Sequence, residues 1–501
     1  MNQPNSARDA ADRADALPER RICPLRRGDP WSLAGVASRP LGRLCLALLW
    51  AFSIDPMEFS TFGSKPRAQL SIAHAQDLES PASSIQRVTR SRGESRDARR
   101  EPPVPDTSKL ALVGGTLWFP SGEVLTNGLV VIQEAQISYA GPLRPIPSDA
   151  VVVKVEGKVL TPGFFALETG IGLAEISAEP STRDDSPGND EVDPIRAAFS
   201  AADGFNPRST LIPVARTGGI TVALSTPTGG LISGTSALTD LGADSARILR
   251  AGAALHVQLD APGLSALEGT FPLALMRLRE ALDDTRSHVS RPQAYEQNAL
   301  RALRTSRLDL LCLAEVLGKR RPIVARVSRA ADILRIIELL KAYGIRLILS
   351  GAEEGWMVAD QIAAAEVPVI LKPLTNQPTS FRELASSYEN AARLHESGVR
   401  LMFTTYDAHS VHNLRQEAGN AIRAGLPREV ALQALTSTPA EVFGLEYGLT
   451  LQRGSRGDVA VWSADPFEVT SHLEQLYSGG QRVDLTTRQS MLRERYRRRS
   501  P

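Results

Sequence analysis

The sequence is poor in the residues from which metal centres and disulfide frameworks are built. Its three cysteines, Cys23, Cys45 and Cys312, are too few for a disulfide framework and form no CxxC zinc motif. It has only 7 histidines, and arginine supplies most of its 57 basic residues. Because 56 acidic residues leave a net charge of +1, the basic excess of a dedicated nucleic-acid-binding protein is also missing. We therefore expect no nucleic-acid partner.

A long hydrophobic run is missing too. The longest uncharged apolar stretch near the start is Leu44–Ile54, which is shorter than the roughly 20 residues that span a bilayer. It resembles the apolar part of a signal peptide, and Ala73-His74-Ala75 has the small-x-small form of a cleavage site. Residues 1–75 therefore predict a leader and export to the periplasm or the medium, with no integral membrane segment in the mature body. The alternative is a disordered extension with one apolar segment.

The rest of the chain has enough apolar residues, 42% overall, for a sizeable core. Residues 76–109 are rich in Ser, Arg and Pro and predict a disordered linker. Short apolar runs separated by turn residues predict β-hairpins in 110–161 and again in 446–485. These two segments are expected to join into one small β-sandwich, followed by a basic tail at 486–501.

Between the two β segments, strand-like and helical patterns alternate over 162–445, which predicts a (β/α)8 barrel of the TIM type. Residues 330–343 show the i, i+3, i+4, i+7 apolar spacing of a helix, with Ser328 as N-cap and Gly344 as stop. A doubly wound sheet is the alternative, although the glycine-rich phosphate turn typical of it is missing. An eighth strand is expected within 260–320. The other seven are predicted at Val159–Phe165, Thr221–Ser225, Ala253–Leu259, Ile323–Val327, Arg346–Leu349, Val367–Leu371 and Leu401–Phe403.

Three motifs resemble the amidohydrolase superfamily. Gly157–Phe164 is similar to the start of its first barrel strand, and Gly454 with Asp458–Trp462 to the segment that returns to its β-sandwich. Asp407-Ala408-His409 and Asn413-Leu414 resemble the region after the eighth strand of imidazolonepropionase-like members. The resemblance covers residues 110–485 and implies a barrel with a split β domain.

The resemblance also implies hydrolysis of C–N bonds by one or two divalent metals, Zn or Fe, at the barrel mouth. The family's ligands are a His-x-His pair after strand 1, a Lys on strand 4, His on strands 5 and 6, and Asp on strand 8. Here Glu168 and Gly170 take the His-x-His positions, and Arg326 takes the strand-5 position. No Lys occurs between Lys158 and Lys319, and the segment after strand 6 has no His. Since only Asp407 matches, we expect neither a metal nor another cofactor.

Two residues are candidates for catalysis without that metal. Asp407 is a candidate general base on water, provided that its pKa is raised, and the alternative is a purely structural hydrogen bond. His409 lies in the same motif, and with His412 and Asp407 it offers an improvised metal site. Asn413 is expected near the pocket.

Other polar residues have structural interpretations. Glu168 and Arg326 are expected to form a buried ion pair in the position of the metal, or else a polar pocket for a charged ligand. Glu353-Glu354 is expected to be a solvated loop pair, and Asp184-Asp185 to lie in a flexible mouth loop at 179–193. His256 is expected to be a core histidine inside a strand.

Two hypotheses follow from this set. The first is a pseudoenzyme that has lost its metal site and binds a small molecule or a partner at the barrel mouth. The second is an active hydrolase on cyclic-amide-like, non-peptide C–N bonds that uses an atypical site around Asp407 and His409.

Overall fold

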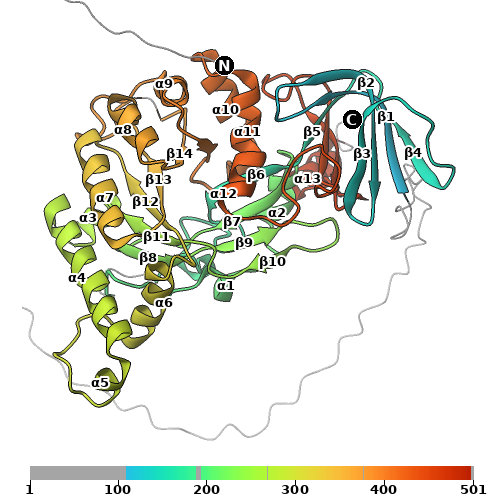
Figure 1. The fold of residues 1–501 in the computed structure, drawn as a ribbon. Helices are drawn as coiled ribbons and strands as arrows, with labels where there is room; N and C mark the ends of the chain where they lie inside the picture. The colour runs from blue at the N-terminus through green and yellow to red at the C-terminus, as the bar shows by residue number, and fades with distance from the viewer. Residues whose placement is uncertain (1–108, 188–192, 268, 376, 498–501) are drawn as a thin grey trace, which may run out of the picture. The chain divides into compact units, whose positions relative to one another are not determined.

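The structure, a computed structural model, describes residues 109–187, 193–267, 269–375 and 377–497 (Figure 1). The predicted leader, its cleavage motif and residues 76–108 of the linker lie outside these ranges, as does the end of the basic tail. Within them, no helix is both long enough and apolar enough to cross a membrane.

One hydrogen-bonded sheet combines strands from the two separated β segments. Its order is β18-β17-β16-β5-β1-β2-β3, with β4 paired to β1, and β5 meets β16 in antiparallel register (Figure 1). The two β-rich segments, which lie about 300 residues apart, are therefore neighbours in space. The strands are β1 (Lys109–Trp118), β2 (Val124–Gln133), β3 (Gln136–Pro142), β4 (Ala150–Lys154), β5 (Val159–Pro162), β16 (Val459–Trp462), β17 (Leu473–Ser478) and β18 (Gln481–Arg482).

The central part of the chain forms a closed ring of strands. Two sheets are ordered β10-β9-β7-β6 and β15-β14-β13-β12-β11-β8. The second sheet ends at β8, which continues directly into β9 of the first, and a bridge between Leu167 and Thr404 joins β6 to the end of β15. The predicted barrel is confirmed. Its strands are β6 (Phe164–Thr169), β7 (Ile220–Ser225), β8 (Ile232–Thr235), β9 (Ala237–Asp240), β10 (Arg247–Arg250), β11 (Leu255–Gln258), β12 (Ile323–Val327), β13 (Leu347–Gly351), β14 (Val369–Leu371) and β15 (Leu401–Phe403).

The position of the eighth strand was predicted wrongly. The described residues of 260–320 form helices and turns. The position between β7 and β11 is filled by β8 and β9, where β8 pairs antiparallel with β11 and β9 pairs antiparallel with β7. The segment Ile232–Asp240 is completely buried, yet it is rich in Ser, Thr and Gly. A search for apolar runs therefore misses it. The helices in 260–320 are α3 (Ala261–Ser265), α4 (Phe271–Ser290), α5 (Pro292–Glu296) and α6 (Arg307–Leu317).

The predicted helix at 330–343 is confirmed as α7 (Ala330–Tyr343). Gly344 ends it in the left-handed conformation, with φ of 69°, and the N-cap is Arg329 rather than Ser328. The remaining helices are η1 (Pro180–Thr182), α1 (Ala201–Gly204), α2 (Leu211–Arg216), η2 (Gly355–Val358), α8 (Ala359–Ala364), α9 (Asn390–Glu396), η3 (Val411–Asn413), α10 (Leu414–Arg423), α11 (Arg428–Leu435), α12 (Ser437–Val442) and α13 (Arg488–Arg497).

Trp462 on β16 connects the sheet to the barrel. Its side chain is completely buried and stacks on Phe164 of β6 with ring centroids 5.4 Å apart. Its indole Nε1–H donates to Thr161 Oγ1 at 2.9 Å. Gly219 gives the ring its space, because a Cβ there would lie 2.7 Å from Trp462 Cζ2.

Candidate functional site

A small polar cavity lies at the carboxyl ends of the barrel strands, where TIM barrels place their active sites. Its volume is about 240 Å³. It is lined by four residues that the sequence places at the positions of the former metal site: Glu168, Gly170, Arg326 and Asp407.

Glu168 is fixed at the end of β6 by two other barrel strands. Its backbone has a positive φ of 44°, which is unusual for a residue with a side chain. Ser350 on β13 donates a hydrogen bond to Glu168 Oε2, and Nδ1 of His256 on β11 lies 3.5 Å from Glu168 Oε1. His256 is completely buried, as predicted for a core histidine. The carboxylate is thus held in place against the barrel interior.

Arg326 forms its ion pair with a residue that the sequence did not suggest. Arg326 Nε lies 2.9 Å from Asp260 Oδ2, and the guanidinium stacks over Tyr406 at 3.8 Å from the ring centroid. Burial opposes the charge of Arg326, but the surrounding Tyr406 and acidic side chains outweigh it, so its pKa is raised further. The predicted direct pair between Glu168 and Arg326 is therefore wrong, because Asp260, just after β11, takes the partner's place.

Asp407 lines the cavity, but both of its carboxylate oxygens accept hydrogen bonds from the turn that follows it. Its Oδ1 accepts the backbone N–H of His409 at 2.9 Å, and its Oδ2 accepts Ser410 Oγ. Burial alone would raise the pKa of Asp407, but these hydrogen bonds outweigh burial and lower it. The raised pKa that the general-base hypothesis requires is therefore not found.

The other residues of this motif point elsewhere. His409 is exposed, and His412 Nδ1 lies 3.1 Å from the backbone carbonyl of His409. Asn413 Oδ1 accepts a hydrogen bond from Gln416, and neither His409 nor Asn413 lines the cavity. In the described ranges, no three His, Cys, Asp or Glu side chains are grouped to hold a metal, so the improvised site of Asp407, His409 and His412 is wrong.

Comparison with known proteins finds similarity to one family in part of the sequence and in the fold. Residues 280–483 match the amidohydrolase family. The crystal structure of an amidohydrolase from Thermotoga maritima MSB8 has the same fold, with a TM-score of 0.66 at 23% identity over 75% of this chain and 99% of that chain. Residues 280–483 therefore resemble the amidohydrolase family, and the fold of the chain is shared with that amidohydrolase. Amidohydrolase tasK of Hapsidospora irregularis is 29% identical over 129 residues, a stretch that covers 25% of this chain and only 12% of that protein.

The metal that this superfamily implies does not fit the residues present. Gly170 has no side chain with which to bind a metal, and the fixed charge of Arg326 repels a cation. Buried polar atoms without hydrogen-bond partners do occur nearby, on His256, Asp260 and Glu353. However, among the residues that the structure describes they form no metal-binding group. The residues of this cavity therefore do not fit a catalytic metal.

Two residues of the site were missed by sequence analysis. Tyr406 lines the cavity, accepts the stacked guanidinium of Arg326 and lies 2.9 Å from Ser350 Oγ through its hydroxyl. Burial raises the pKa of this phenol far above its usual value, so it stays neutral. Asp260 was missed because its role depends on a contact between the turn after β11 and the neighbouring strand β12. A tyrosine with a positive φ, here 56°, is rare but is not visible in a sequence pattern.

Glu353 and Glu354 are buried, so the prediction of a solvated loop pair is wrong. Glu354 accepts the backbone N–H of Ala330 and that of Ala385, each at 3.1 Å, and so ties the loop after β13 to α7 and to the loop after β14. Burial raises the pKa of Glu353, which lies among the groups that interact with Arg326.

The predicted mouth loop supplies one wall of the cavity. Arg183 and Asp185 form a bidentate ion pair, with Nε–Oδ1 at 2.9 Å and Nη2–Oδ2 at 3.0 Å. Thr228, after β7, donates its hydroxyl to Asp185 Oδ2 at 3.1 Å. Asp185 is buried, so the part of the loop that carries it is anchored rather than free.

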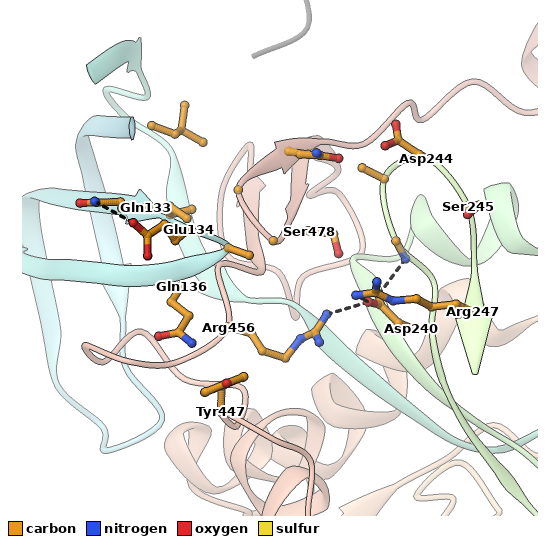
Figure 2. Close-up of a pocket in the computed structure, with 18 residues that line it drawn as sticks. Gln133, Glu134, Gln136, Asp240, Asp244, Ser245, Arg247, Tyr447, Arg456 and Ser478 are labelled. Carbon is orange, nitrogen blue, oxygen red and sulfur yellow. Dashed lines mark hydrogen bonds and ion pairs between the residues drawn. The ribbon is translucent and has the colours of Figure 1, made fainter. Parts of the chain in front are cut away.

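A larger cavity of about 650 Å³ lies beside β9 and the β sheet, and it has a structural explanation (Figure 2). Arg247 and Arg456 converge on the buried carboxylate of Asp240, each at 3.2 Å, and the Gly242 N–H donates to it. Arg456 also pairs with the buried Asp458 at 3.0 Å. Both arginines of this cavity are thus paired with buried carboxylates, which fits a structural role where the barrel packs against the β sheet.

The buried carboxyl group of Glu417 makes the stability of the fold depend on pH. This buried residue of α10 accepts the backbone N–H of Leu374 at 2.8 Å, and burial raises its pKa from 4.5 to about 7. Between these values the folded chain binds the proton more tightly than the unfolded chain does, so stability falls as pH rises through this window. Glu417→Gln, which can still accept from Leu374, is expected to gain up to about 3 kcal/mol over wild type at pH 8 and little at pH 5. Urea unfolding at both pH values checks this, and equal differences would contradict it.

Proposed function

We propose that this chain is a member of the amidohydrolase superfamily that has lost metal-dependent hydrolysis and binds a small polar molecule at the barrel mouth. The observation that supports this most is the position of Arg326, whose guanidinium lines the cavity between Asp260 and Tyr406. A protein side chain thus holds the positive charge that the superfamily normally recruits from solution.

Electrostatics supports the same proposal. A divalent ion about 4 Å from this guanidinium would be repelled by about 8 kcal/mol at an effective dielectric constant of 20, twice the value for unit charges. Metal–ligand bonds have to offset this repulsion, yet the described residues provide no group of three or more ligands. A neutral or zwitterionic organic molecule faces no such barrier.

The alternative is an active hydrolase centred on Asp407. It is supported by the position of Asp407 in the same cavity as Glu168, where a carboxylate can accept a proton from water. Two observations oppose it. The pKa of Asp407 is lowered, which makes its carboxylate a weaker base, and His409 is exposed and does not line the cavity.

A substrate screen distinguishes the two. The full-length chain is assayed on amides, lactams, hydantoin-like rings and esters, with Zn, Mn or Fe supplied. We expect no turnover above that of Asp407→Ala for any substrate. Turnover by the wild type that Asp407→Ala abolishes would establish the hydrolase and overturn the proposal.

We also propose that the chain is exported and that it belongs to the imidazolonepropionase-like subgroup. The apolar run Leu44–Ile54 supports export, and the Asp407-Ala408-His409 motif supports the subgroup. N-terminal sequencing of the mature protein tests export, and a terminus that still begins at Met1 would refute it.

A further inference from the structure

Arg326 presents two terminal nitrogens to the cavity. Its Nε pairs with Asp260, but neither terminal nitrogen has a hydrogen-bond partner among the described residues. The second guanidinium of the cavity, Arg183, is different, because Asp185 engages it through two bonds. Arg326 is held in place by Asp260 and by the ring of Tyr406, so its terminal fork is preorganised. A planar fork of this kind fits the two oxygens of a carboxylate.

The same cavity has an excess of negative charge opposite this fork. Three carboxylates and two guanidiniums line it, and one carboxylate, Asp185, is neutralised by Arg183. In the part of the chain that the structure describes, neither Glu168 nor Asp407 has a Lys or Arg partner. They receive hydrogen bonds from hydroxyl and backbone donors, and His256 Nδ1 lies 3.5 Å from Glu168. These two carboxylates can therefore receive a cationic group.

Size limits the ligand. The cavity, at about 240 Å³, is smaller than the roughly 300–1,000 Å³ of sites for drug-sized ligands. The cavity therefore fits a compact molecule with few atoms beyond its polar groups.

We propose that this cavity binds a small zwitterion of the amino-acid class, with its carboxylate on the terminal nitrogens of Arg326 and its ammonium group facing Glu168 and Asp407. This inference rests on the proposed metal-independent binding function and specifies its ligand. A zwitterion pairs its carboxylate with the guanidinium and its ammonium group with the two carboxylates. A simple acid is repelled by those carboxylates, and a simple amine leaves the terminal nitrogens of Arg326 without a hydrogen-bond acceptor.

The test is calorimetric titration of the full-length chain with matched ligands. Glycine, L-alanine, L-serine and L-leucine serve as zwitterions, and 3-methylbutylamine and 4-methylpentanoate are the counterparts of leucine that lack one charge. We expect at least one amino acid to bind in the millimolar range or tighter. Each single-charge counterpart should bind about tenfold more weakly or worse, because a hydrogen-bonded charge is lost.

Two variants test which residue binds the carboxylate of the ligand and which binds its ammonium group. Arg326→Gln should weaken the amino acid and the acid but leave the amine unchanged, whereas Asp407→Asn should weaken the amino acid and the amine but leave the acid unchanged. Arg247→Gln, an exposed arginine beside the larger cavity, is the matched control and should change nothing. Circular dichroism confirms that each variant is folded.

The outcomes separate this inference from the proposed function. If no amino acid binds, or if a single-charge counterpart binds equally well, the zwitterion inference is overturned, while a chain without hydrolytic activity still supports the proposed function. If binding requires a stoichiometric divalent metal, or if an added ligand is hydrolysed in an Asp407-dependent way, both fail.

Discussion

Replacing Arg326 with Met is expected to lower the free energy of unfolding by about 3 kcal/mol at pH 7, the low end of what removing one partner of a buried ion pair costs. The variant leaves Asp260 buried without its cation, and it removes the positive charge that faces Glu168 and Glu353. Met fills much of the same volume, so the loss reports charge rather than packing. Equilibrium unfolding in urea measures it.

The loss is expected to shrink as the pH falls. Burial already raises the pKa of Asp260, and Arg326 opposes that rise. Without Arg326 the pKa of Asp260 in the folded chain rises further, so the folded state takes up a proton at a higher pH than the unfolded state does. The variant therefore regains stability relative to wild type between pH 7 and pH 5.

A matched control lies on the surface of α7. Arg335 forms an exposed ion pair with Glu338, and Arg335→Met should cost no more than about 0.5 kcal/mol at either pH. A loss in Arg326→Met that equals the control, or that is independent of pH, would show that Arg326 does not compensate the buried carboxylates.

Replacing Trp462 with Ala is expected to cost about 4 kcal/mol, because a completely buried aromatic side chain leaves a cavity between the sheet and the barrel. The substitution removes the stack on Phe164 and the hydrogen bond to Thr161. Trp462→Phe keeps an aromatic ring against Phe164 and should cost about 1–2 kcal/mol, mainly for the lost donor. Thermal unfolding of both variants checks this, and equal losses would show that the ring stack contributes nothing.

The repeating elements of the fold were predictable because their patterns are local. The strand Ile323–Val327 and the helix Ala330–Tyr343 have apolar spacings that depend only on neighbouring residues, and both were found within a residue or two. The strand pair β8–β9 was missed for the opposite reason. Its residues are mostly Ser, Thr and Gly rather than apolar, and they are buried because β8 pairs with β11 and β9 pairs with β7, which local spacing does not reveal.

The candidate site was predictable as a set of positions but not as a set of contacts. Glu168, Gly170, Arg326 and Asp407 were placed correctly because barrel strands bring their carboxyl ends to one mouth. The choice of partner depended on loops. Asp260, in the turn after β11, forms the ion pair with Arg326. Ser410 donates a hydrogen bond to Asp407 within the turn that follows β15. Glu354 is buried because it ties two such loops together, which no property of its neighbours in sequence indicates.

The central claim is that the guanidinium of Arg326 takes the place of the metal. The amount of metal that the full-length chain retains tests this claim most directly. The purified protein is dialysed against excess zinc, then against metal-free buffer, and its zinc content is measured by mass spectrometry beside that of Glu168→Gln. We predict far less than one zinc per chain in the wild type and the same amount in the variant. One zinc per chain that the wild type retains and Glu168→Gln loses would contradict the account.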